Sequence, residues 1–116
     1  MPSTISHRSG EIVFVPFLFS DRPVVKHRPA LIISSAAYLA HRQEVIVAAV
    51  TSNVHRELFV GDYQLEEWQA AGLPKPSVVT GILRTIKQAM IVRKLGALSG
   101  RDFSGVKKAL TQALDL

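Results

Sequence analysis

The sequence predicts a mostly β fold, a small antiparallel β-barrel that ends in a C-terminal helix. Short runs of β-branched and aromatic residues recur along the 116-residue chain, and turn-forming residues separate them. The last segment changes to a helical period, because its apolar residues recur three and four positions apart. No repeat, low-complexity tract or linker offers a second domain a place to begin, so we expect one domain over residues 1–116.

The first predicted strand covers residues 11–19, which are rich in Val, Ile and Phe. Pro16 lies inside this run and cannot donate a hydrogen bond to a neighbouring strand, so we expect this part at a sheet edge or bulge. Similar short apolar runs predict the remaining strands, at residues 30–34, 44–52, 58–60, 77–83 and 89–95.

Two helices are expected. Residues 65–71 are rich in Glu, Gln and Ala, and Gly72 is a suitable C-terminal stop for a short surface helix. The C-terminal helix is expected to begin after Ser99, an N-cap candidate that has Asp102 three residues later. The apolar face of this helix is predicted to contain Phe103, Val106, Leu110, Ala113 and Leu114.

The chain is basic, with 14 Lys and Arg residues against 9 Asp and Glu, a formal net charge of +5 and a sequence pI near 10.0. This balance favours a polyanionic partner such as nucleic acid or an acidic peptide, although charge alone carries no sequence specificity. The absence of cysteine excludes thiolate nucleophiles and Cys-rich zinc sites. No His-Glu-x-x-His or comparable cluster occurs, so we expect neither a metal nor another cofactor.

The longest apolar stretches, residues 12–19 and 45–50, are much shorter than the roughly 20 residues that a membrane-spanning helix needs. Residues 1–10 are polar and lack the apolar segment of a signal peptide. We therefore expect a cytoplasmic protein without a membrane partner.

Polar residues at the two ends of an apolar, strand-forming stretch indicate a phosphate-handling site. Pro29 restricts Arg28 to extended backbone, so its guanidinium is expected at the end of an ordered loop. A guanidinium suits a phosphodiester better than the point charge of lysine does. Thr51 and Ser52 end the strand predicted at residues 44–52. The simpler alternatives are a solvated loop cation for Arg28 and a capped strand end for Thr51 and Ser52.

Three further side chains are candidates for a role in such a site. His27 is a candidate general acid or base, because an imidazole exchanges protons near neutral pH; an inert loop histidine is the alternative. Phe17 and Phe19 are candidates for stacking on a base, although phenylalanines in an apolar strand more often belong to the core.

Several short motifs follow one another in a characteristic order. They are Gly10-Glu11-Ile12-Val13 before Pro16-Phe17, His27-Arg28-Pro29-Ala30-Leu31, Val50-Thr51-Ser52, Trp68-Gln69-Ala70-Ala71-Gly72-Leu73, Lys75-Pro76-Ser77, and Arg93-Lys94-Leu95-Gly96 before Leu98-Ser99. In order and spacing they resemble the MazF/PemK toxins of type II toxin–antitoxin systems, and the PemK-like subgroup in particular. The likeness covers nearly the whole chain.

The resemblance implies an SH3-like barrel that cleaves single-stranded RNA without a metal ion, through attack of the adjacent ribose 2′-hydroxyl on phosphorus. It implies that Arg28 stabilises the charge that develops on the phosphate and that Thr51 supplies a hydroxyl contact. His27 and Arg84 then become candidates for proton transfer. The candidates for RNA binding are Lys26, Ser52 and Phe17.

The resemblance also implies two kinds of protein partner. Relatives form homodimers, and an RNA groove is expected to span or border the contact between the subunits. An acidic antitoxin protein is expected to lay an extended, partly disordered segment over the RNA-binding surface.

The chain departs from the family pattern at one place. Several relatives carry an Arg or an acidic residue on the strand before the segment that matches Arg84-Thr85-Ile86, whereas Val79-Thr80-Gly81-Ile82 here has no ionisable side chain. Gly81 is also explained simply as a strand bulge. This departure leaves open a non-catalytic barrel of the same fold that binds RNA or antitoxin. An unrelated basic β-barrel that binds folded RNA by shape is a further alternative.

Overall fold

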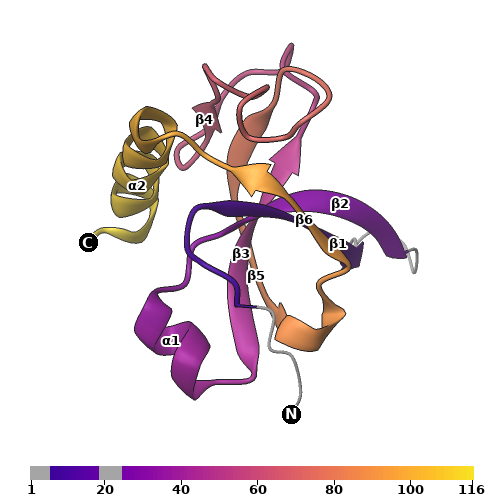
Figure 1. Ribbon diagram of the computed structural model, residues 1–116. Helices are drawn as coiled ribbons and strands as arrows, with labels where there is room; N and C mark the ends of the chain where they lie inside the picture. Colours follow the sequence, from indigo (N-terminus) through magenta and orange to yellow (C-terminus); the bar gives the residue numbers. More distant parts are fainter. Residues whose placement is uncertain (1–5, 19–24) are drawn as a thin grey trace.

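The computed structural model describes residues 6–18 and 25–116, whose strands form one antiparallel sheet (Figure 1). In order across the sheet, the strands are β4 (Tyr63–Gln64), β5 (Val78–Lys87), β3 (Glu44–Thr51), β2 (Val25–Ile32), β1 (Glu11–Leu18) and β6 (Arg93–Ala97). The described residues also contain the α-helices α1 (Ala36–His41) and α2 (Gly100–Leu114) and the 3₁₀ helix η1 (Gln88–Met90).

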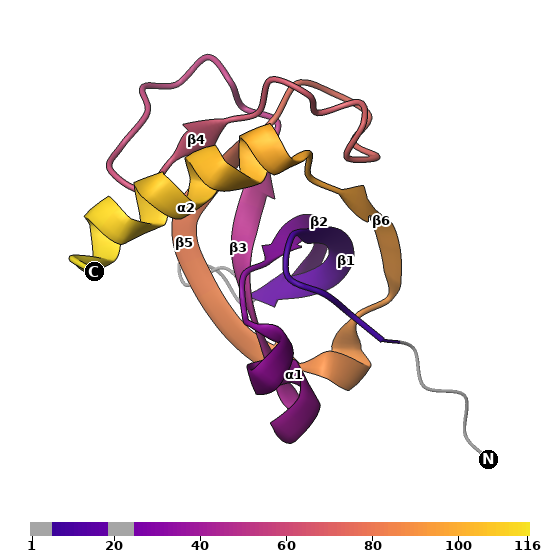
Figure 2. The ribbon, with the colours of Figure 1, turned by 60° about the vertical axis from the view of Figure 1, so that its left-hand side comes forward.

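The sheet curls into a half-barrel, which confirms the predicted mostly β fold with a C-terminal helix (Figure 2). Helix α2 crosses one end of the curled sheet and packs on β4 and β5, while the short α1 lies at the opposite end beside β3. The loops that connect β3, β4 and β5 gather at the same end as α2.

Side chains alternate between the two faces of the sheet and form two apolar clusters. One cluster lies beneath α2, where Val106 and Leu110 of the helix are buried against the strands. Its strand members include Ile12, Leu31, Ala48 and Val79, and the second cluster, on the other face, includes Val13, Val15, Ile32, Val45 and Val47. Burial of each Val, Leu or Ile side chain in these clusters contributes about 1.5–3 kcal/mol, so the two clusters supply the main driving force for folding.

Strands β1 and β2 continue beyond their other neighbours as a two-stranded ribbon, formed by residues 15–18 and 25–28. Strand β6 pairs with β1 only up to Phe14, and β3 pairs with β2 only from Ala30 onward. In the described part of the chain these ribbon segments therefore pair with each other alone. The ribbon contains Pro16, which confirms the expected edge position, because the missing N–H group faces no neighbouring strand.

Strand β2 begins earlier than predicted. The apolar pattern starts at Ala30, whereas the strand starts at Val25 and includes Arg28, which lies opposite Val15. The expectation that Arg28 leaves from a loop end is thus wrong, since pairing with β1 extends the strand through polar residues. Phe19, the last residue of the predicted first strand, lies outside the described residues.

Three other predicted elements differ from the structure. Residues 58–60 form a loop, and the nearest strand is the two-residue β4. The strand predicted at residues 89–95 is divided between η1 and the start of β6. Residues 65–71 form turns instead of a helix, although Gly72 ends them with a positive φ of 82°. Helix α1, which begins after the N-cap Ser35, was not predicted.

Helix α2 follows the prediction at its start and its centre. Ser99 is the N-cap and its hydroxyl accepts a hydrogen bond from the backbone N–H of Asp102. Ala113 and Leu114, which were expected on the apolar face, are exposed, because the helix extends past the edge of the sheet.

The carboxylate of Asp102 fastens α2 to the segment around β4. It is fully buried and accepts hydrogen bonds from the Tyr63 hydroxyl (2.9 Å), the backbone N–H of Glu66 (3.1 Å) and that of Glu67 (2.9 Å). Burial, together with this hydrogen bond, raises the pKa of Tyr63 to about 12, so the phenol stays protonated and remains a donor.

The Asp102→Asn substitution should destabilise the fold. One side of an amide is a donor, and it would face the N–H of Glu67 or Glu66, leaving buried donors without an acceptor. We expect a loss of about 2 kcal/mol in the free energy of unfolding, measured by urea denaturation. The same substitution at the exposed Asp115 is the control and should change stability by less than about 0.5 kcal/mol. Equal stability of the two variants would contradict the anchoring role.

Candidate functional site

A pocket of about 480 Å³ opens between the β1–β2 ribbon, the end of β3, the middle of β5 and the loop before β4. Its lining combines basic, hydroxyl and apolar side chains from segments far apart in the sequence. They are Phe17, Arg28, Ala49, Val50, Thr51, Arg56, Phe59, Val60, Asp62, Thr80, Gly81 and Ile82.

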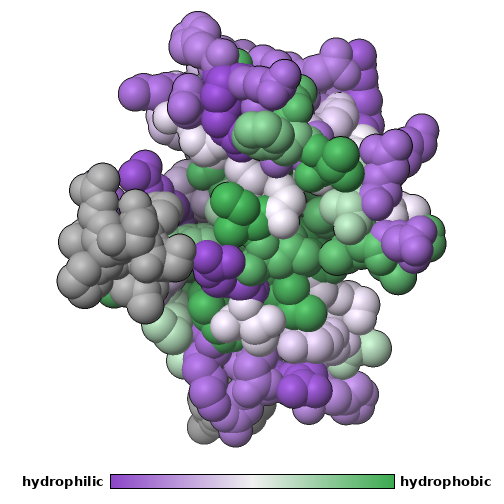
Figure 3. Space-filling model, turned by 180° about the vertical axis from the view of Figure 1, so that it is seen from behind, coloured by the Kyte–Doolittle hydropathy of each residue, from purple (hydrophilic) through white to green (hydrophobic). Residues whose placement is uncertain are grey.

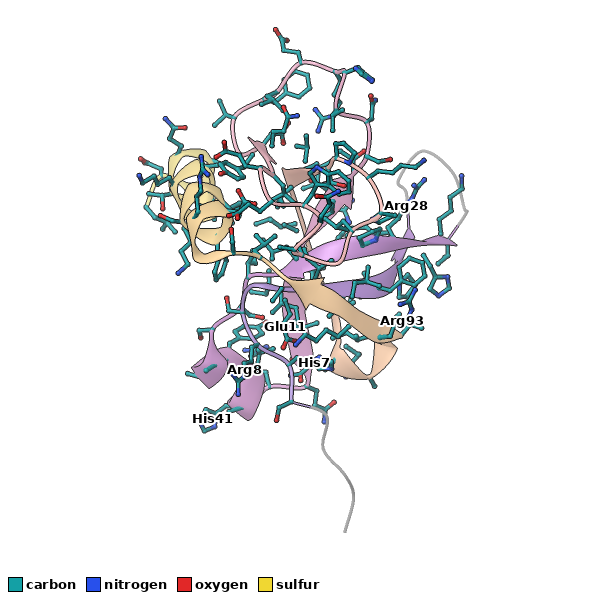
Figure 4. The ribbon with its side chains drawn as sticks, turned by 45° about the horizontal axis from the view of Figure 1, so that its top comes forward. His7, Arg8, Glu11, Arg28, His41 and Arg93 are labelled. Atoms are coloured by element: carbon teal, nitrogen blue, oxygen red, sulfur yellow. The ribbon has the colours of Figure 1, made fainter. Side chains whose placement is uncertain are left out.

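Strand pairing places Arg28 at this pocket. Arg28 lies opposite Val15, and alternate residues of a strand share a face, so the side chains of Phe17 and Arg28 lie on the same face of the ribbon. Figure 4 shows Arg28 on the side of β2 that is turned toward the connecting loops. Arg28 therefore extends from an ordered strand, and this strand forms part of one wall of the pocket.

Thr51 is the last residue of β3 and brings a hydroxyl to the same pocket. Its Oγ1 atom accepts a hydrogen bond from the backbone N–H of Asn53 at 3.1 Å. Because this contact uses a lone pair, the hydroxyl hydrogen can still be donated to an acceptor in the pocket. The arrangement can offer a phosphate one charged and one neutral donor.

A bulge in β5 forms the floor of the pocket. Ala48 lies opposite Leu83 and Val50 opposite Val79, so Ala49 faces the three residues 80–82, and the bulge expected at Gly81 is confirmed. The Thr80 hydroxyl donates to the carbonyl of Ala49 at 2.8 Å and accepts from the N–H of Ile82 at 3.2 Å. Thr80 thus stabilises the bulge.

Two glycines bring the loop before β4 against this bulge. Gly61 has a φ of 98°, and a Cβ placed on it would lie 3.1 Å from the Cα of Gly81. The same Cβ would lie 3.2 Å from the Cβ of Ala113 in α2. Side chains at both positions would force the loop away from β5, so the close approach requires glycine.

Arg56 and Asp62 form an ion pair within the loop wall. The Nη1 atom of Arg56 lies 3.1 Å from Oδ2 of Asp62, and the Arg56 guanidinium lies 5.5 Å from the centre of the Phe59 ring. Asp62 also accepts hydrogen bonds from the N–H groups of Phe59 (3.0 Å) and Gly81 (3.1 Å). The carboxylate consequently joins the loop, the bulge and the arginine.

The other residues proposed from the sequence lie outside the pocket lining. His27 lies on the opposite face of β2 from Arg28 and stacks on Phe14, with 5.7 Å between ring centres. Lys26 lies opposite Phe17 in the β1–β2 pairing, Ser52 follows Thr51 in the chain, and both side chains are exposed. Arg84 is exposed on β5 opposite Val47, and the register places it on the same sheet face as Arg28.

The sequence analysis missed the loop residues of the pocket, which are Arg56, Phe59, Val60 and Asp62. Residues 58–60 were interpreted as a strand because they are apolar. In the structure Phe59 is 63% exposed and Val60 is 73% exposed. An apolar run flanked by a basic and an acidic residue was the signal that could have identified this loop.

A second charged group lies at the start of β1, away from Arg28 (Figure 4). The buried Glu11 carboxylate lies 3.2 Å from Nζ of Lys94 and 3.7 Å from Nδ1 of His7. It also accepts a hydrogen bond from the backbone N–H of Arg8. These contacts tie the segment before β1 to β6.

Across residues 6–18 and 25–116, no helix has both the length and the apolar character needed to cross a membrane. Nor does this part of the chain contain a group of three or more His, Asp or Glu side chains placed to hold a metal ion.

Three solved structures illustrate the fold that this chain shares with known proteins. An endoribonuclease from a mycobacterial species, in complex with its cognate antitoxin, is 19% identical with a TM-score of 0.78, and the match covers 96% of this chain and 97% of that chain. Toxin MazF-mt6 of Mycobacterium tuberculosis is 26% identical, with a TM-score of 0.74 and coverage of 91% and 97%. A chain of the MazE-MazF structure (Form-II) from Deinococcus radiodurans is 19% identical, with a TM-score of 0.73 and coverage of 97% and 99%.

No curated protein sequence gives a significant match. The family model of the PemK-like, MazF-like toxins of type II toxin–antitoxin systems matches residues 8–114. This match spans the six strands and two α-helices of the described residues, together with the residues that line the pocket. The chain therefore belongs to the PemK-like, MazF-like toxin family.

Proposed function

We propose that the chain is the toxin component of a toxin–antitoxin system and an endoribonuclease that cleaves single-stranded RNA. The observation that carries the proposal is the shared pocket of Arg28 and Thr51, which offers a cation and a hydroxyl from two neighbouring elements. Membership of the toxin family and the fold shared with a mycobacterial endoribonuclease support it.

In the proposed reaction, the ribose 2′-oxygen attacks the adjacent phosphorus and the bond from phosphorus to the 5′-oxygen breaks. The products are a 2′,3′-cyclic phosphate and a 5′-hydroxyl end, and one proton moves from the attacking to the leaving oxygen. Arg28 stabilises the negative charge on the non-bridging oxygens, and Thr51 donates a hydrogen bond to one of them. Because the nucleophile belongs to the RNA and Arg28 supplies positive charge, the reaction needs no metal ion.

The two candidates for proton transfer differ in position. Arg84 shares a sheet face with Arg28, whereas His27 stacks on Phe14 on the other face of β2. The register thus favours Arg84. Lys26 and Ser52 lie next to pocket residues and are proposed to contact the RNA backbone. Phe17 lines the pocket wall but is only 4% exposed and belongs to the apolar cluster of Val13 and Val15, so it supports the wall instead of stacking on a base.

The bulge of β5 supports a second candidate function, that of a barrel which binds RNA or antitoxin without cleavage. The bulge offers no ionisable side chain, and the Thr80 hydroxyl is already bonded to the carbonyl of Ala49. Proton transfer would then lack a group that several relatives have. A cleavage assay separates the two functions.

We propose that the working form is a cytoplasmic homodimer controlled by an acidic antitoxin. The net charge of +5 suits an acidic segment, whose carboxylates can pair with the cations at the pocket while apolar side chains contact Phe59 and Val60. Two structures of the same fold support this partner: the mycobacterial endoribonuclease was determined in complex with its cognate antitoxin, and the Deinococcus structure is of MazE-MazF.

Incubation of the purified protein with a long mixed-sequence RNA in EDTA should give cleavage with 5′-hydroxyl ends. The expected chemistry needs only the RNA hydroxyl and protein side chains, so chelation should leave the rate unchanged. Mapping of the ends by sequencing, with and without prior phosphorylation, identifies the products. Intact RNA would favour the binding function, and loss of cleavage on chelation alone would contradict the mechanism.

Replacement of Arg28 by Ala should lower the cleavage rate about 10²- to 10³-fold with little loss of stability, the effect expected for removal of one preorganised donor. Arg28→Lys should also be strongly impaired, because an ammonium group cannot bind two phosphate oxygens in a bidentate manner. Thr51→Val removes the hydroxyl that is proposed to donate to the phosphate, so it should also lower the cleavage rate. Single-turnover rates with one oligonucleotide check all three variants.

Matched controls for these variants are Arg93→Ala and Thr85→Val, which alter a strand arginine and a strand threonine outside the pocket. Both controls should keep the wild-type rate. Near-normal cleavage by Arg28→Lys would show that general electrostatic attraction suffices, and unchanged kinetics of Thr51→Val would remove Thr51 from the site.

An antitoxin peptide and an RNA oligonucleotide should displace each other, because the proposal gives them one surface. Fluorescence anisotropy of labelled RNA checks this, and added salt should weaken the complex of protein and peptide without abolishing it. Simultaneous binding of both ligands would contradict the shared site. Sedimentation of the protein alone should give the mass of a dimer, and a monomer at micromolar concentration would contradict the homodimer.

A further inference from the structure

We propose that Arg56 recognises a guanine base of the RNA and is a specificity-determining residue of this toxin. The inference rests on the proposed function, since it assigns part of the pocket to the base next to the phosphate-handling groups. Four observations carry it: the hydrogen bonds of the guanidinium, its neutralisation by Asp62, the apolar surface beside it and the rigid support of the loop.

The hydrogen bonds of Arg56 leave one edge of its guanidinium available. Nη1 lies 3.1 Å from Oδ2 of Asp62 in the ion pair and donates a hydrogen bond to the carbonyl of Glu57 at 3.2 Å, so both contacts engage this one nitrogen. Within the described residues, Nε and Nη2 have no hydrogen-bond acceptor. These two atoms form the edge of an arginine that can bind two neighbouring acceptors at once.

Neutralisation by Asp62 favours a base over a phosphate. The Asp62 side chain is only 5% exposed and lies within ion-pair distance of Arg56, so the pair has no net charge toward the pocket. A neutral pair attracts a phosphate less than a single cation does, while its two remaining donor groups keep their geometry. Guanine presents O6 and N7 as adjacent acceptors and matches such a donor edge, whereas adenine presents N7 beside a donor.

The surface next to Arg56 suits the flat face of a base. Phe59, Val60 and Ile82 are 63%, 73% and 51% exposed, and all three line the pocket. Figure 3 shows apolar side chains gathered at the centre of the face that carries β3 and β5, with hydrophilic ones around them. Unstacked bases of single-stranded RNA bind to exposed aromatic side chains, while a phosphate gains nothing from such a surface.

The position of Arg56 is fixed by the pocket itself. Asp62 receives hydrogen bonds from Phe59 and from Gly81 of the β5 bulge, and Gly61 approaches Gly81 closely. The arginine is therefore held to the same bulge that faces the end of β3, where Thr51 lies. A base bound at Arg56 would therefore lie at a fixed position relative to the phosphate held by Arg28 and Thr51.

The first experiment compares cleavage of a randomised RNA pool by the wild type and by Arg56→Lys. Lysine keeps the charge and can keep the ion pair with Asp62, but it lacks the two-donor edge. We expect the wild type to prefer guanine at one position near the cut, and Arg56→Lys to lower that preference about tenfold or more, the discrimination of one bidentate contact. Cleavage of pool members without this guanine should change little.

The control is Arg42→Lys. Arg42 is also paired with a carboxylate, Glu44 at 3.3 Å, and also lies over an aromatic ring, that of Tyr38 at 5.2 Å, yet it lies outside the pocket. Its replacement should leave the sequence preference unchanged. A uniform loss of cleavage for all sequences in Arg56→Lys would mean a phosphate contact, and an unaltered preference would mean no contact; either result would overturn the proposal.

The second experiment measures equilibrium binding of a short oligonucleotide that is 2′-deoxy at the cut, so that binding is read without cleavage. Replacing the guanine by 7-deazaguanine removes only the N7 acceptor, and it should weaken binding to the wild type several-fold but not binding to Arg56→Lys. Equal sensitivity of the two proteins overturns the guanine contact. Absence of RNA cleavage by the wild type would count against the proposed function alone, because this binding comparison still decides the role of Arg56.

Discussion

The buried carboxylate of Asp102 is the constraint on which the arrangement of the pocket depends. Its three hydrogen bonds hold α2 to β4 and to the turn that follows. The end of α2 supports the loop before β4 from behind, since Ala113 lies next to Gly61, and the loop in turn presses on the β5 bulge. A single buried acid in the first turn of the helix thereby helps to position Arg56 and Asp62, which line the pocket near the far end of that helix.

One sequence prediction was wrong because of contacts made outside the predicted segment. Residues 65–71 have helical propensity, yet the Leu65 N–H donates to the carbonyl of Ser77. At the other end, Gly72 lies so close to β6 that a Cβ on it would clash with the carbonyl of Leu95, and these contacts favour turns. Elements whose stability is local were predictable, such as β3 with its β-branched run and α2 with its Ser99 cap. The early start of β2 depends on pairing with β1, which no local pattern reports.

The candidate site was predictable to a similar degree. The sequence predicted site residues at Arg28, before Pro29, and at the polar end of β3. Arg28 and Thr51 do line one pocket. The face that each side chain occupies follows from strand register, so the separation of His27 from Arg28 could not be read from adjacent sequence positions. Arg56 and Asp62 were missed because their contact closes a loop, and the loop is held by glycines whose partners are distant in sequence.

The close contact of Gly61 with Gly81 has a consequence for how such a protein can diversify. Backbone meets backbone there, so inserting residues or adding a side chain would shift the loop before β4, which we propose contacts a base, together with the floor beside Thr51. Changes in loop length would then endanger activity along with selectivity. Exchange of the half-buried side chain at position 56 or of the exposed ones at 59 and 60 avoids this shift, because it alters the chemistry of the wall and leaves the backbone contact in place. New target preferences should therefore arise by point substitution on a conserved backbone.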